Sequence, residues 1–391
     1  MSGYSYYEFF AGGGMARAGL GEAWNCVFAN DFDPMKVKTY ETNWGGEHIL
    51  CQDVAKLSPA DLAGHVDLAW ASFPCQDLSL AGDYAGLGRA AAAVATRSGT
   101  FWPFWSLMKR LKKDGRGPKL IVLENVYGAL TSNGGRDFAA IGKALSGAGY
   151  DFGAIVVDAI RFVPQSRPRV FIVAVDSSVS VPASLLADGP LAEWHPKALV
   201  SASAGLGAAD KKRWLWWLLP TPPLRNHAFA DLVEDHPTGV KWHTREETAR
   251  LLAMMTPLNL AKVERAKRQG ARVVGAIYKR TRHDPDGAKR QRAEVRFDEV
   301  AGCLRTPRGG SSRQTIIVVK GASVRSRLLS AREAARLMGL GDDYKLPERY
   351  NDAYHVAGDG VCVPAVRHIA GHLLEPILRS ARPDASRVAA E

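Results

Sequence analysis

A cysteine, a carboxylate and two arginines border apolar runs of the sequence in a pattern that suits nucleophilic chemistry. Cys75 stands in the loop FPCQ directly after the apolar segment VDLAWAS, and Glu124 follows the run LIVL. Arg167 and Arg169 directly precede VFIVAV. Singly, a cysteine is more often a small buried hydrophobe and an arginine pair a surface charge. Together at neighbouring strand ends, where α/β folds place reactive groups, they predict a site for covalent catalysis.

A second group of residues predicts a cofactor site. The segment Glu8–Gly21, EFFAGGGMARAGLG, places glycines at the end of a leading strand, where a ligand can approach the backbone. Its spacing is not G-x-G-x-x-G, so a dinucleotide is not favoured. Asp31, in NDFD, falls where a carboxylate commonly accepts from ribose hydroxyls, and Asp53 could accept from an adenine amino group. This order predicts an adenosine-containing cofactor.

The elements that must position these residues alternate in the first 175 or so positions. Short apolar strands are predicted between helical stretches, at Tyr4–Phe10, Cys26–Ala29, Val66–Trp70, Leu120–Leu123, Ala154–Val157 and Val170–Val175. Continuous apolar strands separated by helices indicate a parallel sheet covered on both faces. The fold class is therefore α/β, with a Rossmann-like doubly wound sheet.

Composition excludes several classes of protein. The 391 residues are 46% hydrophobic and 23% charged, which excludes disorder, collagen and a disulfide miniprotein. The five cysteines are scattered, with no C-x-x-C spacing, so we expect neither a disulfide framework nor a metal site. No apolar run approaches the ~18 residues of a membrane span. We expect a soluble protein of a reducing compartment, with no membrane contact.

The second half of the chain differs from the first. Between about Asp176 and Asp210 the composition shifts toward Ser, Ala, Gly and Pro, and residues 210–325 lose the alternation of strand and helix. Trp214, Trp216 and Trp217 there are most simply a packing anchor. Arg327–Leu340 again has the pattern of a helix, with an S-x-x-E capping box at its start.

Most of the positive charge lies in one stretch of that half. The chain carries 51 Lys and Arg against 40 Asp and Glu, a net charge of +11. Residues 241–296 hold 15 Lys and Arg against 6 Asp and Glu, so +9 of the excess is there. A charge run is usually a solvated face. Here Gly, Ser and aromatic residues interrupt the charges, which favours contacts with phosphates or base edges.

The ordered set of motifs resembles the DNA (cytosine-5) methyltransferases of bacteria and phages. The resemblance covers FFAGGG, NDFD, QDV, FPCQDLS, RSGTFW, LENV, QSRPRVF, the capping-box helix, and GDGVCVPAVRHI at Gly358–Ile369. It implies a catalytic and cofactor-binding domain at 1–189, an irregular target recognition domain at 190–326, and a return to the catalytic domain at 327–391. Duplex DNA would be the partner, and a specific cytosine the substrate. The protein would be a cytoplasmic, nucleoid-associated monomer of a prokaryote or phage.

The resemblance also implies roles for individual residues. Cys75 would add to carbon 6 of a flipped cytosine, Glu124 would bind ring nitrogen 3 and the exocyclic amine, and Arg167 and Arg169 would orient the base. S-adenosyl-L-methionine would donate the methyl group. Further cofactor contacts would come from Phe10, Ala11, Gly12, Gly14, Asp31, Phe32, Asp53, Val54, Pro74, Phe101 and Asp359. DNA contacts would come from Gln76, Ser79, Arg280, Arg282, Arg305, Arg308, Ser311, Ser312 and Arg313.

Three positions depart from the family pattern, and two alternatives stay open. Glu8 stands where Asp is common and Ser330 where Thr is common, and both changes are conservative. Asp359 stands where Asn is usual, which places a charged acceptor instead of a neutral amide near the expected cofactor pocket. One alternative is a cytosine-5 methyltransferase acting on tRNA, although the long basic insertion favours DNA. The other is a catalytically inactive DNA-binding relative. Neither the recognition sequence nor a cognate restriction endonuclease can be read from the chain.

Overall fold

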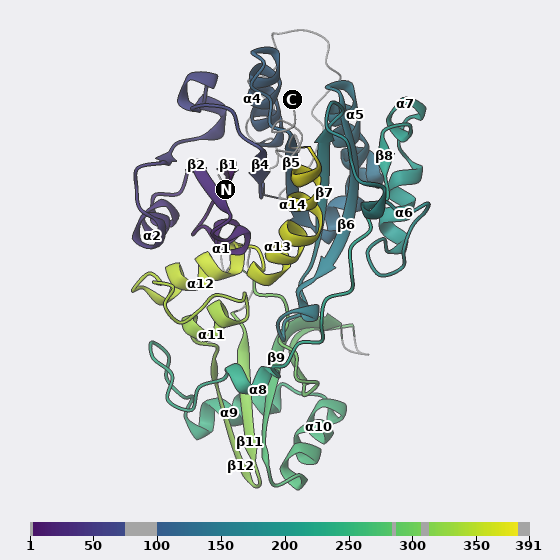
Figure 1. Ribbon diagram of the computed structural model, residues 1–391. Helices are drawn as coiled ribbons and strands as arrows, with labels where there is room; N and C mark the ends of the chain where they lie inside the picture. Colours follow the sequence, from purple (N-terminus) through teal and green to yellow (C-terminus); the bar gives the residue numbers. More distant parts are fainter. Residues whose placement is uncertain (1–2, 75–99, 284–286, 306–312, 382–391) are drawn as a thin grey trace. The chain divides into compact units, whose positions relative to one another are not determined.

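The computed structural model describes residues 3–74, 100–283, 287–305 and 313–381, which divide into two compact units (Figure 1). The first unit comprises the described residues within 1–157, 168–222 and 361–391. The second comprises those within 158–167 and 223–360. These bounds differ from the predicted domain limits at 189 and 326, so a recognition domain spanning 190–326 stays a prediction.

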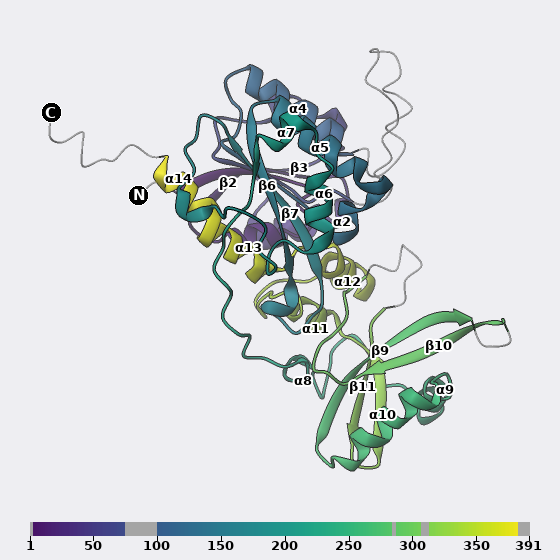
Figure 2. The same cartoon turned by 90° about the vertical axis from the view of Figure 1, so that its right-hand side faces the viewer.

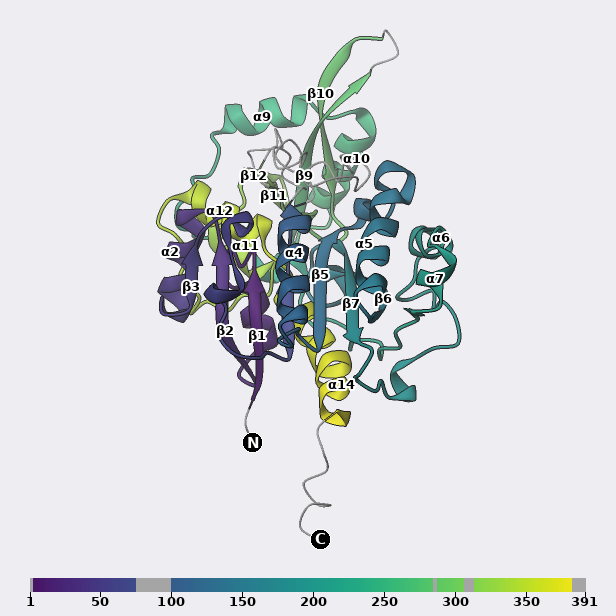
Figure 3. The same ribbon diagram turned by 90° about the horizontal axis from the view of Figure 1, so that it is seen from above.

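The first unit is built on an eight-stranded sheet with strand order β3-β2-β1-β4-β5-β7-β6-β8 (Figure 3). Pairing is parallel between β1 and β2, β1 and β4, β2 and β3, β4 and β5, and β6 and β8. The strands are β1 Tyr4–Phe9, β2 Trp24–Asp31, β3 Ile49–Cys51, β4 Leu68–Ala71, β5 Leu120–Val126, β6 Tyr150–Asp158, β7 Pro168–Asp176 and β8 Trp214–Leu215. The predicted α/β class with a parallel-dominated sheet is confirmed.

One strand of this sheet runs against the others. β7 pairs antiparallel with β5, although an all-parallel sheet was expected. Only residues 159–167 connect β6 to β7, and a connection this short cannot form the crossover of a dozen or more residues that a parallel neighbour requires. The reversal brings the start of β7 beside the end of β5.

Helices and an aromatic core cover the sheet. Phe104 and Met108 of α4 and Phe138 and Ile141 of α5 belong to the buried cluster that contains Tyr7 and its neighbours on the sheet. On the opposite face, α1 packs against α13. The helices of this unit are α1 Met15–Leu20, α2 Pro34–Trp44, α4 Phe101–Lys113, α5 Arg136–Gly147, α6 Lys197–Ala204, α7 Ala208–Lys211, α13 Val363–Ile369 and α14 Glu375–Ser380.

The tryptophan cluster is a packing anchor within the first unit. Trp217 is fully buried, and Trp214 packs edge-on against Phe138 and Phe152, with ring centroids 6.0 and 5.4 Å apart. Large aromatic side chains dominate core energetics because each buries so much surface. This packing explains why residues up to 222 group with the first unit.

The second unit is more regular than its composition indicates. It holds a four-stranded antiparallel sheet of order β10-β9-β11-β12 (Figure 2). Its strands are β9 Arg272–His283, β10 Lys289–Arg296, β11 Thr315–Lys320 and β12 Ser323–Leu328, and its helices are α8 Phe229–Leu232, α9 Arg245–Ala253, α10 Pro257–Arg268, α11 Ala331–Arg336 and α12 Tyr350–Asp359. A small core joins α9 and α10 to the sheet through Leu251, Val263, Ile277 and Ile317.

The predicted helix Arg327–Leu340 is shorter than expected. Arg327 and Leu328 pair with Ile316 and Thr315 in the sheet, so the helix begins only after Ser330. The capping box lies where the sequence places it, with Ser330 Oγ accepting from the Glu333 N–H. α11 ends at Arg336. Cross-strand pairing therefore competes successfully with helix propensity at its first residues.

Candidate active site

The loop that follows β1 is tied to the next strand by hydrogen bonds. The Ala11 N–H donates to the Asn30 carbonyl (2.9 Å), and the Gly12 N–H donates to Asp31 Oδ2 (2.9 Å). Gly14 has φ 79°, and a Cβ there would lie 2.3 Å from Trp44 Nε1. A side chain at position 14 is therefore excluded both by conformation and by space.

Asp31 and Phe32 lie at the end of β2 in contrasting environments. Asp31 is 5% exposed, and its Oδ1 accepts from the Asp33 N–H (2.9 Å). Burial raises the pKa of Asp31, opposed by Lys36. Phe32 is 64% exposed, which is unusual for a large apolar ring. The space beside Gly12 is also open, since no described atom other than those of Gly12 and its two chain neighbours lies within 4 Å of the position its Cβ would take.

Asp53 and Val54 begin a short 3₁₀ turn after β3. Asp53 Oδ1 accepts from the Ala55 N–H (2.9 Å), and Val54 is buried. Asn30, for which the sequence predicts no role, donates from Nδ2 to the Leu50 and Gln52 carbonyls (3.1 and 2.7 Å). Asn30 thereby fixes the segment that carries Asp53. Its position directly before Asp31 is the only sequence signal of this role.

A largely buried ion pair lies where β5 and β7 meet. Glu124 is 7% exposed, and its Oε1 lies 3.2 Å from Arg169 Nε. The antiparallel register places Arg169 opposite Val126, two residues beyond Glu124. An arginine next to a carboxylate provides both a charge and further N–H donors.

Asn125 connects this pair to the loop that leads to Cys75. Its Nδ2 donates to the carbonyl of Phe73 (3.1 Å), and both residues are buried. Pro74, which is partly exposed, follows directly. Cys75, Gln76 and Ser79 lie outside the described residues. Of the predicted catalytic group, the structure brings together Glu124 and Arg169, and it places the last residues before Cys75 beside them. Asn125 was missed because an Asn after Glu124 has no distinctive spacing.

Comparisons with known proteins identify the family. The sequence model of the C-5 cytosine-specific DNA methylases matches residues 4–375. The chain belongs to this family. It is 25% identical over 376 residues to the type II methyltransferase M.BsuFI of Bacillus subtilis, covering 96% of this chain and 73% of that protein. It is 26% identical over 385 residues to the type II methyltransferase M.HaeII of Haemophilus aegyptius, covering 98% and 96%.

Solved structures agree on the fold. The crystal structure of the S. pombe Dnmt2 methyltransferase matches 96% of this chain and 99% of its own length, with a TM-score of 0.56 and 15% sequence identity. The chain is thus a DNA (cytosine-5) methyltransferase with the Rossmann-like fold that its motifs predict. None of the described helices of the methylase is long and apolar enough to cross a membrane. Among the described residues, no group of His, Cys, Asp and Glu could hold a metal ion.

Arg167 belongs to the second unit of the methylase and makes contacts that the sequence does not indicate. It is 2% exposed, and Nη1 donates to Cys303 Sγ (3.4 Å) and the Leu304 carbonyl (3.1 Å). Nη2 donates to the Gly358 and Gly360 carbonyls, at 2.8 Å each. These four partners of Arg167 are protein atoms, whereas Arg169 pairs with Glu124. That both arginines orient the base stays a prediction.

The remaining predicted site residues of the methylase are dispersed. Phe10 has φ 56°, Ala11 is buried, and Phe101 is 1% exposed with its ring centroid 5.5 Å from that of Phe73. Asp359 is exposed at the end of α12. Arg280, Arg282 and Arg305 are exposed, and Arg313 lies over the Tyr350 ring. Arg308, Ser311 and Ser312 are outside the described residues.

Glu8, one of the departures from the family pattern, is a buried carboxyl of the methylase. It is 1% exposed, and its Oε2 has no hydrogen-bond partner in the described part of the chain. Burial raises the pKa of Glu8 to about 8, opposed by Arg17. The carboxyl is therefore mostly protonated at neutral pH.

We expect Glu8→Gln to remove a pH dependence of stability. The folded state holds the Glu8 proton more tightly than the unfolded chain does, with a pKa of about 8 against 4.5. The resulting stabilisation is complete below pH 4.5 and is lost as the pH rises through 8. At ~1.4 kcal/mol per pKa unit, the wild-type chain should lose about 3 to 5 kcal/mol more than Glu8→Gln between those limits. Urea unfolding from pH 5 to 9 measures this, and parallel profiles would contradict it.

Proposed function

We propose that the methyltransferase modifies carbon 5 of a cytosine in duplex DNA through a covalent bond to Cys75. Carbon 5 is too weak a nucleophile to attack a methyl group directly. Addition of the Cys75 thiolate to carbon 6 turns the ring into an enamine whose carbon 5 can attack. Loss of the carbon 5 proton and elimination of Cys75 then release 5-methylcytosine. The observation that carries this proposal is the Glu124–Arg169 pair beside the Phe73–Pro74 segment.

The residues of this pair have complementary parts in the proposal. Glu124 binds ring nitrogen 3 and the exocyclic amine of the cytosine, which stabilises the protonated ring during addition of the thiolate. Arg169 holds the Glu124 carboxylate through Nε and has further N–H donors for the base. Asn125 keeps the Phe73 carbonyl beside β5, so that the chain reaches Cys75 from a fixed point. Arg167 has its part within the second unit, where it holds the loops at Leu304 and at Gly358–Gly360.

S-adenosyl-L-methionine fits the residues at the ends of β1 and β2. When bound it supplies the methyl group. The open space at Gly12 would admit its amino acid portion, and the exposed Phe32 ring would pack on the adenine or the sulfonium, to which aromatic faces are attracted. Each Asp31 oxygen accepts one N–H and retains a lone pair for a ribose hydroxyl. Asp53 would take the adenine amine.

The target base must leave the helix for this chemistry. Carbons 5 and 6 are covered by stacking in duplex DNA, so we infer that the cytosine is flipped into the site. Unstacking costs a few kcal/mol, which contacts with the rest of the duplex must offset. The residues predicted to contact DNA can offset this cost. The positive charge of residues 241–296 attracts the phosphate backbone of the duplex.

A mechanism-based trap tests this proposal. Duplex DNA containing 5-fluorocytosine should form a complex with the protein that survives denaturation when S-adenosyl-L-methionine is present. After methyl transfer the fluorine on carbon 5 cannot leave as a proton, so Cys75 cannot be eliminated. Denaturing electrophoresis detects the complex. Glu124→Gln, which keeps the shape of the side chain, should slow its formation by ~10²-fold or more.

Two outcomes of that experiment would overturn the proposal. An enzyme that methylates ordinary DNA but forms no complex with the fluorinated DNA does not use a covalent route. Methyl incorporation into tRNA but not into duplex DNA, measured in parallel with labelled cofactor, would replace the proposed substrate. Bisulfite sequencing of a methylation-free host that expresses the protein then identifies the modified cytosines.

A further inference from the structure

Helix α2 begins and ends beside different parts of the candidate cofactor site. It starts directly after the residues that end β2, where Asp33 Oδ1 accepts from the Met35 N–H (3.0 Å), and it ends at Trp44. It packs against β2 and β3 (Figure 3). Its 11 residues span about 16 Å. The two ends of α2 can therefore act on different parts of one bound molecule.

The end of α2 contacts the glycine loop that follows β1. Trp44 Nε1 donates to the carbonyl of Gly13 (3.0 Å). The backbone N–H groups of Ala11 and Gly12 donate to the end of β2, at 2.9 Å in each case. Three consecutive residues of the loop are thus tied to two elements, β2 through their N–H groups and α2 through a carbonyl.

The Trp44 ring is itself held by a cation from α1. The Arg17 guanidinium lies over the rings of Tyr40 and Trp44, with Cζ 5.7 and 5.2 Å from their centroids. Arg17 Nη1 also donates to the Tyr40 hydroxyl (3.1 Å), which lies 3.2 Å from His48 Nε2. A cation over an aromatic face is attracted to it. Trp44 is therefore held in one orientation, although its side chain is partly exposed.

This support matters because the loop has a conformation that is costly to order. Phe10, Gly12 and Gly14 have positive φ angles of 56°, 56° and 79°. Glycine loses more conformational freedom on ordering than any other residue. A loop that is already ordered before its ligand arrives binds more tightly, because binding then carries no ordering cost. The Trp44 hydrogen bond acts one residue away from the open space beside Gly12.

We propose that Trp44 is a positioning residue for the amino acid portion of S-adenosyl-L-methionine. Its indole N–H holds the Gly13 carbonyl and so keeps the neighbouring Gly12 backbone in the conformation that admits this portion. The inference rests on the proposed function and adds a residue that acts through the loop. The amino acid portion does not react, so Trp44 should affect cofactor binding more than the rate of methyl transfer.

Trp44→Phe tests the hydrogen bond, because it removes the N–H and keeps an aromatic ring beneath Arg17. Isothermal titration calorimetry measures binding of S-adenosyl-L-homocysteine, and competition measures binding of adenosine, which lacks the amino acid portion. We expect the Kd of S-adenosyl-L-homocysteine to rise about 5- to 10-fold, as for one lost neutral hydrogen bond, and that of adenosine to stay nearly unchanged. In turnover, KM for S-adenosyl-L-methionine should rise by a similar factor while kcat is retained.

Tyr40→Phe is the matched control for a change in packing. It removes a hydroxyl from the same helix and leaves both the ring and the Trp44–Gly13 hydrogen bond in place. Its affinity for both ligands should match the wild type. The role of Trp44 is refuted if Trp44→Phe binds S-adenosyl-L-homocysteine as tightly as the wild type. It is also refuted if Trp44→Phe weakens both ligands alike, or if Tyr40→Phe weakens S-adenosyl-L-homocysteine as much as Trp44→Phe does.

Failure of the proposed function gives a different result. The wild-type protein would then not bind S-adenosyl-L-homocysteine, or would bind it without methylating duplex DNA. The comparison of Trp44→Phe with the wild type is made on binding alone, so it distinguishes a wrong positioning residue from a wrong cofactor or substrate.

Discussion

A chain in which Cys75 is replaced by serine should transfer no measurable methyl group to DNA. A serine hydroxyl is far less acidic than a thiol and a much weaker nucleophile at neutral pH, so addition to carbon 6 does not occur at a useful rate. We expect the rate to fall by at least ~10³-fold, as removal of other enzymatic nucleophiles does. Incorporation of label from S-adenosyl-L-methionine into duplex DNA measures it.

The loss of methyl transfer in Cys75→Ser must come from the chemical step alone, and not from weaker DNA binding or lower stability. DNA binding, measured without turnover, and the thermal midpoint should match the wild type, because the change removes no charge. Cys51→Ser is a suitable control, since Cys51 is an exposed thiol outside the catalytic loop. It should keep activity within a few fold. Undiminished methylation by Cys75→Ser would remove the covalent mechanism, and equal loss in both variants would mean that neither thiol acts as the specific nucleophile.

Local patterns were sufficient to predict most of the catalytic sheet. The strands at Leu120–Val126 and Pro168–Asp176 follow from continuous apolar runs, because strands covered on both faces need apolar residues throughout. The capping box at Ser330 and Glu333 was equally predictable, since its partners are three residues apart. The family followed from the order of the motifs, which the comparisons confirm.

Features that depend on distant pairing could be predicted only in part. The sequence predicts that Glu124 and Arg169 share a site, but not that they form an ion pair across 45 positions because β7 is reversed beside β5. The continuation of β9 past Ile277, its last residue paired with β11, was hidden for a different reason. From Lys279 to His283 both faces of β9 are polar, so the alternation that signals a half-buried strand disappears. Only the register shows which charges share a face.

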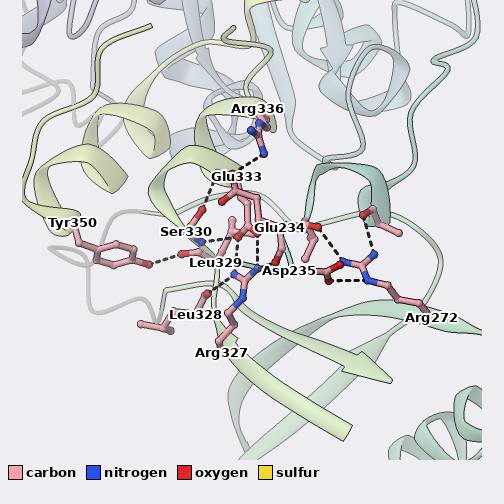
Figure 4. Close-up of polar contacts among 12 residues, drawn as sticks. Glu234, Asp235, Arg272, Arg327, Leu328, Leu329, Ser330, Glu333, Arg336 and Tyr350 are labelled. Carbon is pink, nitrogen blue, oxygen red and sulfur yellow. Dashed lines mark hydrogen bonds and ion pairs between the residues drawn. The ribbon is translucent and has the colours of Figure 1, made fainter. Parts of the chain in front are cut away.

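The buried ion pair of Arg327 and Glu333 should have a second large effect, on stability rather than on catalysis. Both side chains are fully buried and form a bidentate pair, with Nη2 2.6 Å from Oε1 and Nη1 2.8 Å from Oε2 (Figure 4). Glu333 also accepts from the N–H groups of Ser330 (2.7 Å) and Glu234 (2.8 Å). Arg327 donates to the carbonyls of Leu328 and Glu234. The pair thus joins β12, α11 and the Glu234 segment of the second unit.

Arg327→Gln should destabilise the second unit by about 3 to 5 kcal/mol. Removing one partner leaves the Glu333 carboxylate buried without its cation, and the remaining N–H donors cannot replace a full charge. Arg336→Gln is the matched control, because Arg336 is one-quarter exposed and pairs with Asp342 and Glu234 near solvent. It should cost less than about 1 kcal/mol. Hydrogen exchange of peptides from residues 323–340 in increasing urea reports on this region.

The double variant Arg327→Met/Glu333→Leu distinguishes a buried-charge penalty from lost packing. Apolar side chains of similar length fill the space and leave no charge, so the double variant should be more stable than Arg327→Gln. Full recovery is not expected, because the Ser330 and Glu234 N–H groups lose the acceptor that Glu333 provides. A double variant at least as unstable as Arg327→Gln would show that the hydrogen bonds of Glu333, rather than its compensation by Arg327, hold the start of α11 in place.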